Sequence, residues 1–190
     1  MEPIHHFVNQ LVVLHEESWI EFRNLFSPAK LKKDDFFVQP GKVETRFAFL
    51  ESGLTRTYYC NSKGKEFTKK IHSPGGLIGS YTSMTQKSPN AIYVQALMDC
   101  SLLVADYVKV ESLFETHPLI ERLARRLAEV QYVLKEKREM ELAMMSAEDR
   151  YQIFQKEFPG LENDIPQYFV ASYLGITPTQ LSRIRAKKTY

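Results

Sequence analysis

Polar side chains between positions 177 and 187 have the types and the spacing to bind base edges and phosphates. Leu181 and Ile184 are three residues apart and face inward on one predicted helix, which leaves hydroxyl, amide and guanidinium groups on its outer side. Proteins use these groups to contact nucleic acids. The candidate DNA-contacting residues are Thr177, Thr179, Gln180, Ser182, Arg183, Arg185 and Lys187.

The residues around this helix predict a second helix and a tight turn before it. The first helix covers about Gln167 to Leu174, and Gly175 follows at its end, where a left-handed backbone favours glycine. Thr177 and Pro178 supply a hydroxyl cap and a proline at the first helical position, and Gln180 completes a capping box. The pattern is typical of a DNA-binding helix-turn-helix.

Positive charge is concentrated in the same segment. No acidic residue follows Asp164, whereas Arg183, Arg185, Lys187 and Lys188 are all basic, and the net charge of the whole chain is only +2. The residues before this tail therefore sum to about zero or slightly negative. A solvated helix end that complements the helix dipole is the alternative, but such focused charge favours phosphate binding.

The rest of the chain predicts a β-rich region between helices. Apolar residues at helical spacing over 4–26 indicate one helix or a helix pair, and 30–107 contains seven or eight short β-type segments separated by turn residues. This number of strands is typical of a sandwich or barrel. A helix of roughly 40 Å is expected over 119–144, and Ser146 caps another that runs through Phe158.

The long helix carries a narrow apolar stripe. Its members alternate at steps of three and four residues, and opposite charges four residues apart, such as Glu121 and Arg125, flank it. Dimerisation through this helix is favoured over a helix that lies on its own domain, and Lys137 and Glu141 end the stripe. The predicted dimer interface is formed by Ile120, Leu123, Leu127, Val130 and Leu134.

Composition and residue types argue against several other classes. The chain of 190 residues is 44% hydrophobic and 25% charged, as in soluble globular proteins. It has neither a run of about 18 apolar residues nor a secretion signal, so we expect no membrane association and a cytoplasmic location. Cys60 and Cys100 are too few for an iron–sulfur cluster and too far apart for a C-x-x-C site.

Enzymatic chemistry is not indicated either. A metal enzyme in a β-barrel needs several histidines and a carboxylate from neighbouring strands, and only His72 falls in the β-type region. The sequence has no G-x-S-x-G turn and no glycine-rich phosphate loop. We predict no catalytic residues, no metal site and no cofactor. A haem-sensing role through His72 or a cysteine is an open alternative, which an absorbance spectrum of the purified protein would test.

The order of these elements resembles the Crp/Fnr family of bacterial transcription regulators. The most specific segments are S-A-E-D-R-Y from Ser146, the helix-turn-helix from Pro166, G-L-I-G-S from Gly76 and P-N-A-I-Y-V-Q-A from Pro89. The resemblance implies an α+β fold: a double-stranded β-helix jelly roll of the cyclic-nucleotide-binding type with N-terminal helices in 1–116, a dimerisation helix and hinge in 117–145, and a DNA-binding domain in 146–190. It also implies a homodimer on double-stranded DNA, with RNA polymerase as a further partner.

The sequence departs from the family in the ligand pocket. The Gly-Glu pair and the arginine of cyclic-nucleotide binders match Gly79-Ser80 and Asn90, and the hydroxyl residues of the long helix match Lys135 and Glu136. We therefore expect a neutral or aromatic effector, or none, rather than cyclic AMP or cyclic GMP, although Arg46, Arg56 or a lysine could approach a phosphate. The implied pocket residues are Gly79, Ser80, Tyr81, Thr82, Asn90, Ala91 and Tyr93.

Two further expectations concern DNA binding. The family's β-hairpin wing after the recognition helix has no match here, which predicts weaker binding to the DNA backbone. The alternative function is a ligand-sensing or protein-interaction dimer whose helix-turn-helix no longer binds DNA. A steep loss of affinity with salt would distinguish a DNA binder from such a module.

Overall fold

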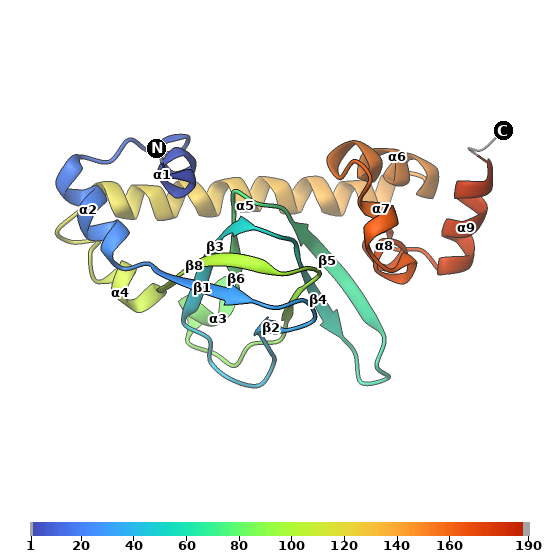
Figure 1. The fold of residues 1–190 in the computed structure, drawn as a ribbon, viewed down its shortest axis with the longest axis horizontal. Helices are drawn as coiled ribbons and strands as arrows, with labels where there is room; N and C mark the ends of the chain where they lie inside the picture. The colour runs from blue at the N-terminus through green and yellow to red at the C-terminus, as the bar shows by residue number, and fades with distance from the viewer. Residues whose placement is uncertain (1, 188–190) are drawn as a thin grey trace.

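The computed structural model describes residues 2–187, and a roll of β-strands lies beneath one long helix (Figure 1). Two short helices, α1 (Pro3–Asn9) and α2 (Glu16–Asn24), precede the strands, which confirms the predicted helix pair. The strands are β1 (Ser27–Leu31), β2 (Phe36–Val38), β3 (Arg46–Ser52), β4 (Thr55–Cys60), β5 (Glu66–His72), β6 (Gly76–Gly79), β7 (Tyr93–Ala96) and β8 (Cys100–Asp106). Helix α3 (Tyr81–Gln86) follows β6, and α4 (Tyr107–Glu111) follows β8.

The strands form two antiparallel sheets of four, in the orders β1-β8-β3-β6 and β2-β7-β4-β5. Apolar side chains from both sheets meet in one core, including Ala48 and Leu50 of β3 and Val94 and Ala96 of β7. The predicted jelly roll is thereby confirmed. Strands β1 and β6 did not stand out in the sequence, because Pro28 weakens the signal of β1 and β6 is a four-residue segment bounded by glycines.

Helix α5 (Pro118–Met144) has two parts with different surroundings. Ile120 and Leu123 are each 1% exposed and belong to the core that also contains residues of α1, α2 and β3. Farther along the helix, Val130 is 40% and Leu134 is 45% exposed, and Leu127 packs partly against the core. Of the predicted seam, Ile120 and Leu123 therefore pack inside one chain, whereas Val130 and Leu134 are exposed.

The C-terminal helices are α6 (Ala147–Glu157), α7 (Leu161–Asp164), α8 (Gln167–Leu174) and α9 (Pro178–Lys187). The expected caps are present: Ser146 Oγ accepts a hydrogen bond from the Asp149 amide at 3.1 Å, and Gly175 has φ of 69°. The short helix α7 was not predicted. Lys188, which was counted in the basic tail, lies outside the described residues.

Helices α6 to α9 share an apolar core that extends into the roll. Phe154, Val170, Leu174 and Leu181 are almost completely buried there, and Ile71 of β5 belongs to the same cluster. Helix α8 packs against β5, on the outer side of the sheet β2-β7-β4-β5. In Figure 1 these helices lie at the far end of α5 from α1 and α2.

Candidate functional site

Helix α9 presents most of the predicted DNA-contacting residues on its open side. Thr179, Ser182 and Arg183 are exposed, whereas Leu181 and Ile184 face the core. Thr177 and Gln180 are exposed as well, but they also cap the helix: the Thr177 amide donates to Gln180 Oε1 at 3.0 Å, and the Gln180 amide donates to Thr177 Oγ1 at 3.2 Å. The capping box thus fixes the helix start, and the next turn carries the free polar groups.

The three basic residues of α9 have different surroundings. Arg183 is exposed and forms no ion pair with another residue in 2–187, while Lys187 Nζ lies 3.5 Å from Glu148 Oε1 of α6. Arg185 is partly buried and acts electrostatically on Tyr151, whose pKa burial raises to about 12. Arg183 is therefore the guanidinium best placed to meet a ligand on the open side of α9.

The residues of the implied effector pocket differ in their surroundings. Asn90 is buried, and its amide nitrogen donates to the carbonyls of Gln39 at 3.1 Å and Ile92 at 2.6 Å, while its Oδ1 accepts from the Ile92 amide at 3.2 Å. These bonds hold the loop between α3 and β7 against the residues that follow β2. The structure thus gives Asn90 a role in the fold.

The other members of this set are spread over the roll. Tyr93 alternates with the core residues Val94 and Ala96, so it lies on the outer face of its sheet, where its ring stacks on Tyr58 at 4.7 Å between centroids. Gly79 ends β6 with φ of 151°, and an added Cβ would lie 3.1 Å from Phe47 Cβ. Ser80 is buried, and the residues that remain exposed are Tyr81, Thr82 and Ala91.

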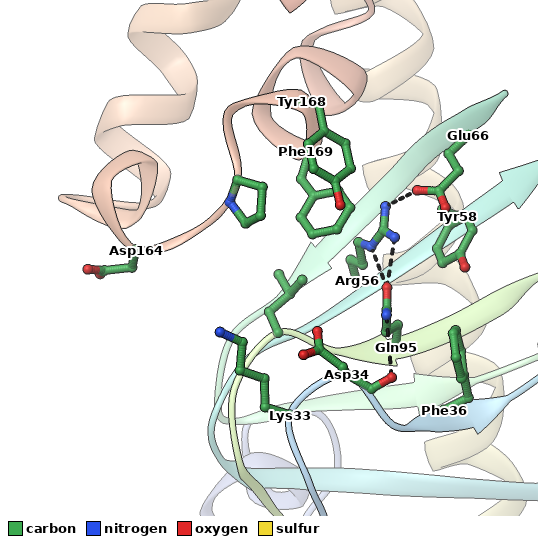
Figure 2. Close-up of a pocket in the computed structure, with 12 residues that line it drawn as sticks. Lys33, Asp34, Phe36, Arg56, Tyr58, Glu66, Gln95, Asp164, Tyr168 and Phe169 are labelled. Carbon is green, nitrogen blue, oxygen red and sulfur yellow. Dashed lines mark hydrogen bonds and ion pairs between the residues drawn. The ribbon is translucent and has the colours of Figure 1, made fainter.

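A cavity of about 370 Å³ does occur where the roll meets α8 (Figure 2). Arg56 of β4 lines it and is only 2% exposed. Its Nε and Nη2 donate to Gln95 Oε1 at 3.0 and 2.7 Å, and its Nη1 donates to Glu66 Oε2 at 2.6 Å. The guanidinium lies over the ring of Tyr58 at 4.0 Å and the ring of Phe169 at 3.5 Å.

This arrangement compensates a buried charge on every side. An unpaired cation inside a protein is strongly disfavoured, whereas here a carboxylate, an amide oxygen and two aromatic faces replace water. Burial also raises the pKa of Tyr58 to about 12, so this ring is neutral beside the cation. The sequence-based expectation that Arg56 or Arg46 approaches a bound phosphate is not supported, because Arg46 is paired with Glu44 at 2.9 Å.

A serine of α8 completes the contact with β5. Ser172 Oγ accepts a hydrogen bond from the Thr68 amide at 2.8 Å and donates to the Glu66 carbonyl at 3.1 Å. Strand β5 is at the edge of its sheet, so these backbone groups have no neighbouring strand to pair with. Sequence reasoning missed this site because its members come from β4, β5, β7 and α8.

The inner face of β4 and β5 carries a second polar group. Thr55 and Thr57 alternate with Arg56, and Thr57 Oγ1 lies 2.8 Å from His72 Nε2. Within residues 2–187, Thr55 Oγ1 is buried and has no hydrogen-bond partner. Lys70, which pairs with Thr57 across the strands, donates to Gln131 of α5 at 3.0 Å, so this face is directed toward α5.

Residues 2–187 contain no group of three histidines, cysteines or carboxylates that could hold a metal ion. His15 and His117 line a cavity of about 490 Å³ beside α2, where His117 Nδ1 lies 3.0 Å from Ser18 Oγ. In the same part of the chain, no helix is long and apolar enough to cross a membrane.

Comparison with known proteins supports the fold. Residues 28–117 match the family model of the cyclic nucleotide-binding domain. No curated protein matches the sequence. The structure is similar to that of FixK2 from Bradyrhizobium japonicum, with a TM-score of 0.71 and 17% identity over 85% of this chain and 83% of that one.

Two further solved structures are equally similar. The c-di-GMP responsive global regulator CLP of Xanthomonas campestris has a TM-score of 0.72 and 13% identity, with 92% of each chain covered. A protein of Eubacterium rectale described as a transcriptional regulator of the Crp/Fnr family has a TM-score of 0.72 and 15% identity, over 90% of this chain and 82% of that one. The fold is therefore that of the Crp/Fnr regulators.

His72 provides a test of the inner polar face through pH. Burial, together with the charges of Lys70 and Lys69, lowers the pKa of His72 from 6.5 to about 3. Between these values the unfolded chain binds a proton that the folded chain does not, so stability decreases as the pH falls. The wild type should lose up to about 1.4 kcal/mol per pH unit more than His72→Gln between pH 6 and pH 4 in denaturant titrations. Equal slopes for both proteins would show that His72 is not buried as described.

Proposed function

We propose that the protein is a DNA-binding transcription regulator of the Crp/Fnr type that acts as a homodimer. The observation that carries this proposal is the open face of α9, where Thr179, Ser182 and Arg183 are exposed next to a helix start fixed by a capping box. The similarity of the fold to regulators of this family supports it. RNA polymerase is the further partner that this function implies.

The chemistry of α9 suits the major groove of DNA. A guanidinium at Arg183 can donate two hydrogen bonds to guanine O6 and N7, and hydroxyls at Thr179 and Ser182 can bind other base edges. Lys187 is at the end of the helix, where an ammonium group meets phosphate. Its ion pair with Glu148 joins two well-exposed side chains, so a phosphate can replace the carboxylate.

The second half of α5 is the proposed dimer interface. Val130, Val133 and Leu134 are exposed apolar residues within two turns of one helix, and the ion pair between Arg125 and Glu129 lies beside them. A second copy would cover this surface and place two α9 helices about a two-fold axis. Leu127, at the edge of the chain's own core, is the first residue of the proposed interface.

An effector other than cyclic AMP or cyclic GMP is part of the proposal. A cyclic phosphate needs a cation or several well-aimed donors in a partly desolvated pocket. Asn90 uses its amide for backbone groups, Arg46 is paired with Glu44, and Arg56 lies on the outer face of the roll. The two arginines expected near a phosphate, Arg46 and Arg56, are thus engaged with other groups.

The DNA contacts can be tested with two substitutions in α9. Arg183→Ala should weaken binding to the preferred site by about 1–3 kcal/mol and relax one base position. Lys187→Ala should weaken binding to all sequences alike and reduce the salt slope by about one unit. Selection from random duplexes followed by salt titrations measures both, and the selected site should be a rough palindrome with half-sites about one helical turn apart. Identical behaviour of the two variants would contradict the assignment.

The dimer interface can be tested by sedimentation. Leu134→Lys places a charge in the proposed apolar interface without touching the core of one chain, so the variant should be monomeric and keep the stability of its monomer. Leu123→Ala is the matched control: it should lower the free energy of unfolding by about 2–5 kcal/mol through the cavity it leaves. A wild type that is already monomeric at micromolar concentration would refute the interface.

Calorimetry decides the question of cyclic nucleotides. Loss of two charge-assisted contacts, each worth about 1.5–3 kcal/mol, should weaken binding by about two to four orders of magnitude relative to a family member that has them. Titration with cyclic AMP and cyclic GMP should give no heat of binding at micromolar concentrations. A dissociation constant in the low micromolar range would show that another residue binds the phosphate.

A further inference from the structure

The contact between α8 and the roll is organised around Arg56 (Figure 2). Strand β4 lies between β7 and β5 in its sheet, so Gln95 and Glu66 hold the guanidinium from the two neighbouring strands. The ring of Tyr58 covers one face, and Phe169 of α8 contacts the cation at 3.5 Å. The roll therefore fixes the cation, and α8 docks on it.

Docking of α8 also fixes α9. The two helices share one apolar core, to which they contribute the buried side chains Val170, Leu174, Leu181 and Ile184. The turn between them contains Gly175, which packs closely against α5: a Cβ added to Gly175 would lie 3.1 Å from Leu142 Cδ2. A change in the position of α8 on the roll must therefore move the open face of α9.

Helix α5 holds the same unit from its other side. Arg138 donates to the Tyr173 carbonyl and lies 4.2 Å from the Tyr173 ring, and Arg150 of α6 donates to the Leu174 carbonyl at 3.0 Å. These contacts attach the end of α8 to the long helix. Against the sheet itself, α8 is held by the stacking of Phe169 on Arg56 and by the hydrogen bonds of Ser172 to β5.

We propose that Arg56 is a positioning residue, which holds α8 and thereby α9 at the orientation that lets both recognition helices of a dimer bind one DNA duplex. This rests on the proposed function. Once one α9 is bound, binding of the second half-site is intramolecular. The affinity that this second contact adds depends on a fixed distance between the two α9 helices. A duplex with a single half-site needs only one α9 and does not depend on that distance.

The test compares Arg56→Met with the wild type on two duplexes, one palindromic and one with a single half-site. The substitution removes three hydrogen bonds and the contact with Phe169. Helices α8 and α9 should then sample several orientations relative to the roll. Affinity for the palindrome should fall by about tenfold or more, while affinity for the single half-site changes by less than about threefold. Arg46→Met, the same substitution in an exposed arginine of β3, should change neither.

Phe169→Leu is the second variant, because it removes the ring from the α8 side and leaves the pairing of Arg56 with Glu66 and Gln95 in place. It should lower the palindrome affinity in the same direction, and faster hydrogen exchange of the Thr68 amide should accompany it, since this amide is bonded to Ser172 of α8. Arg56→Lys should restore part of the lost affinity through its charge.

Three results would overturn the proposal. Unchanged affinities for both duplexes would show that Arg56 does not position α9, and an equal loss on both duplexes would indicate damage to the DNA contacts themselves. A higher palindrome affinity in Arg56→Met would show that docking opposes DNA binding. A wild type that binds neither duplex would instead refute the proposed function.

Discussion

The buried guanidinium of Arg56 is the interaction on which the joint between the roll and the C-terminal helices depends. A cation that is 2% exposed is tolerated only if its partners remain in place together. Those partners come from four elements, β4, β5, β7 and α8, of which β7 and α8 are far from β4 in sequence. The requirement to compensate one charge therefore constrains the outer face of the sheet and the position of α8 at once.

Strand β4 relates this outer contact to the interior of the roll. Its side chains alternate, so Arg56 and Tyr58 point to α8, while Thr55 and Thr57 point inward with His72. The buried hydroxyl of Thr55 has no partner within residues 2–187 and can accept or donate a bond to a ligand. A ligand that displaces this strand from inside would also displace Arg56, because both faces belong to one backbone.

Local interactions are the part of the structure that the sequence predicts well. The cap at Ser146, the left-handed Gly175 and the reciprocal bonds of Thr177 and Gln180 depend on residues within four positions of one another. Their geometry is decided by backbone sterics and by short-range hydrogen bonds, so tertiary structure does not override them. The positions of most strands along the sequence follow from the same local turn signals.

Positions that depend on tertiary packing are harder to predict. Ile120 and Leu134 have the same residue class and belong to the same stripe of α5, yet α1 and α2 cover only the first of them. Spacing cannot show which turns of a helix another element covers. Asn90 and Arg56 are similar cases, because an amide or a guanidinium looks available in sequence until the distant backbone or side chain that occupies it is known.

Helix α5 connects the N-terminal core, the proposed dimer surface and the C-terminal helices, and it limits how an effector can act. Its first turns are fixed in the N-terminal core, its middle exposes the proposed dimer surface, and its last turns contact the turn after α8 through Leu142. A ligand shifts an equilibrium only by the difference in its affinity for the two states. An effector that changes DNA binding must therefore contact groups whose surroundings change when α8 moves. The inner side of β4 meets this condition, whereas the side chain of Asn90 is bonded to the backbone at Gln39 and Ile92 rather than to α8.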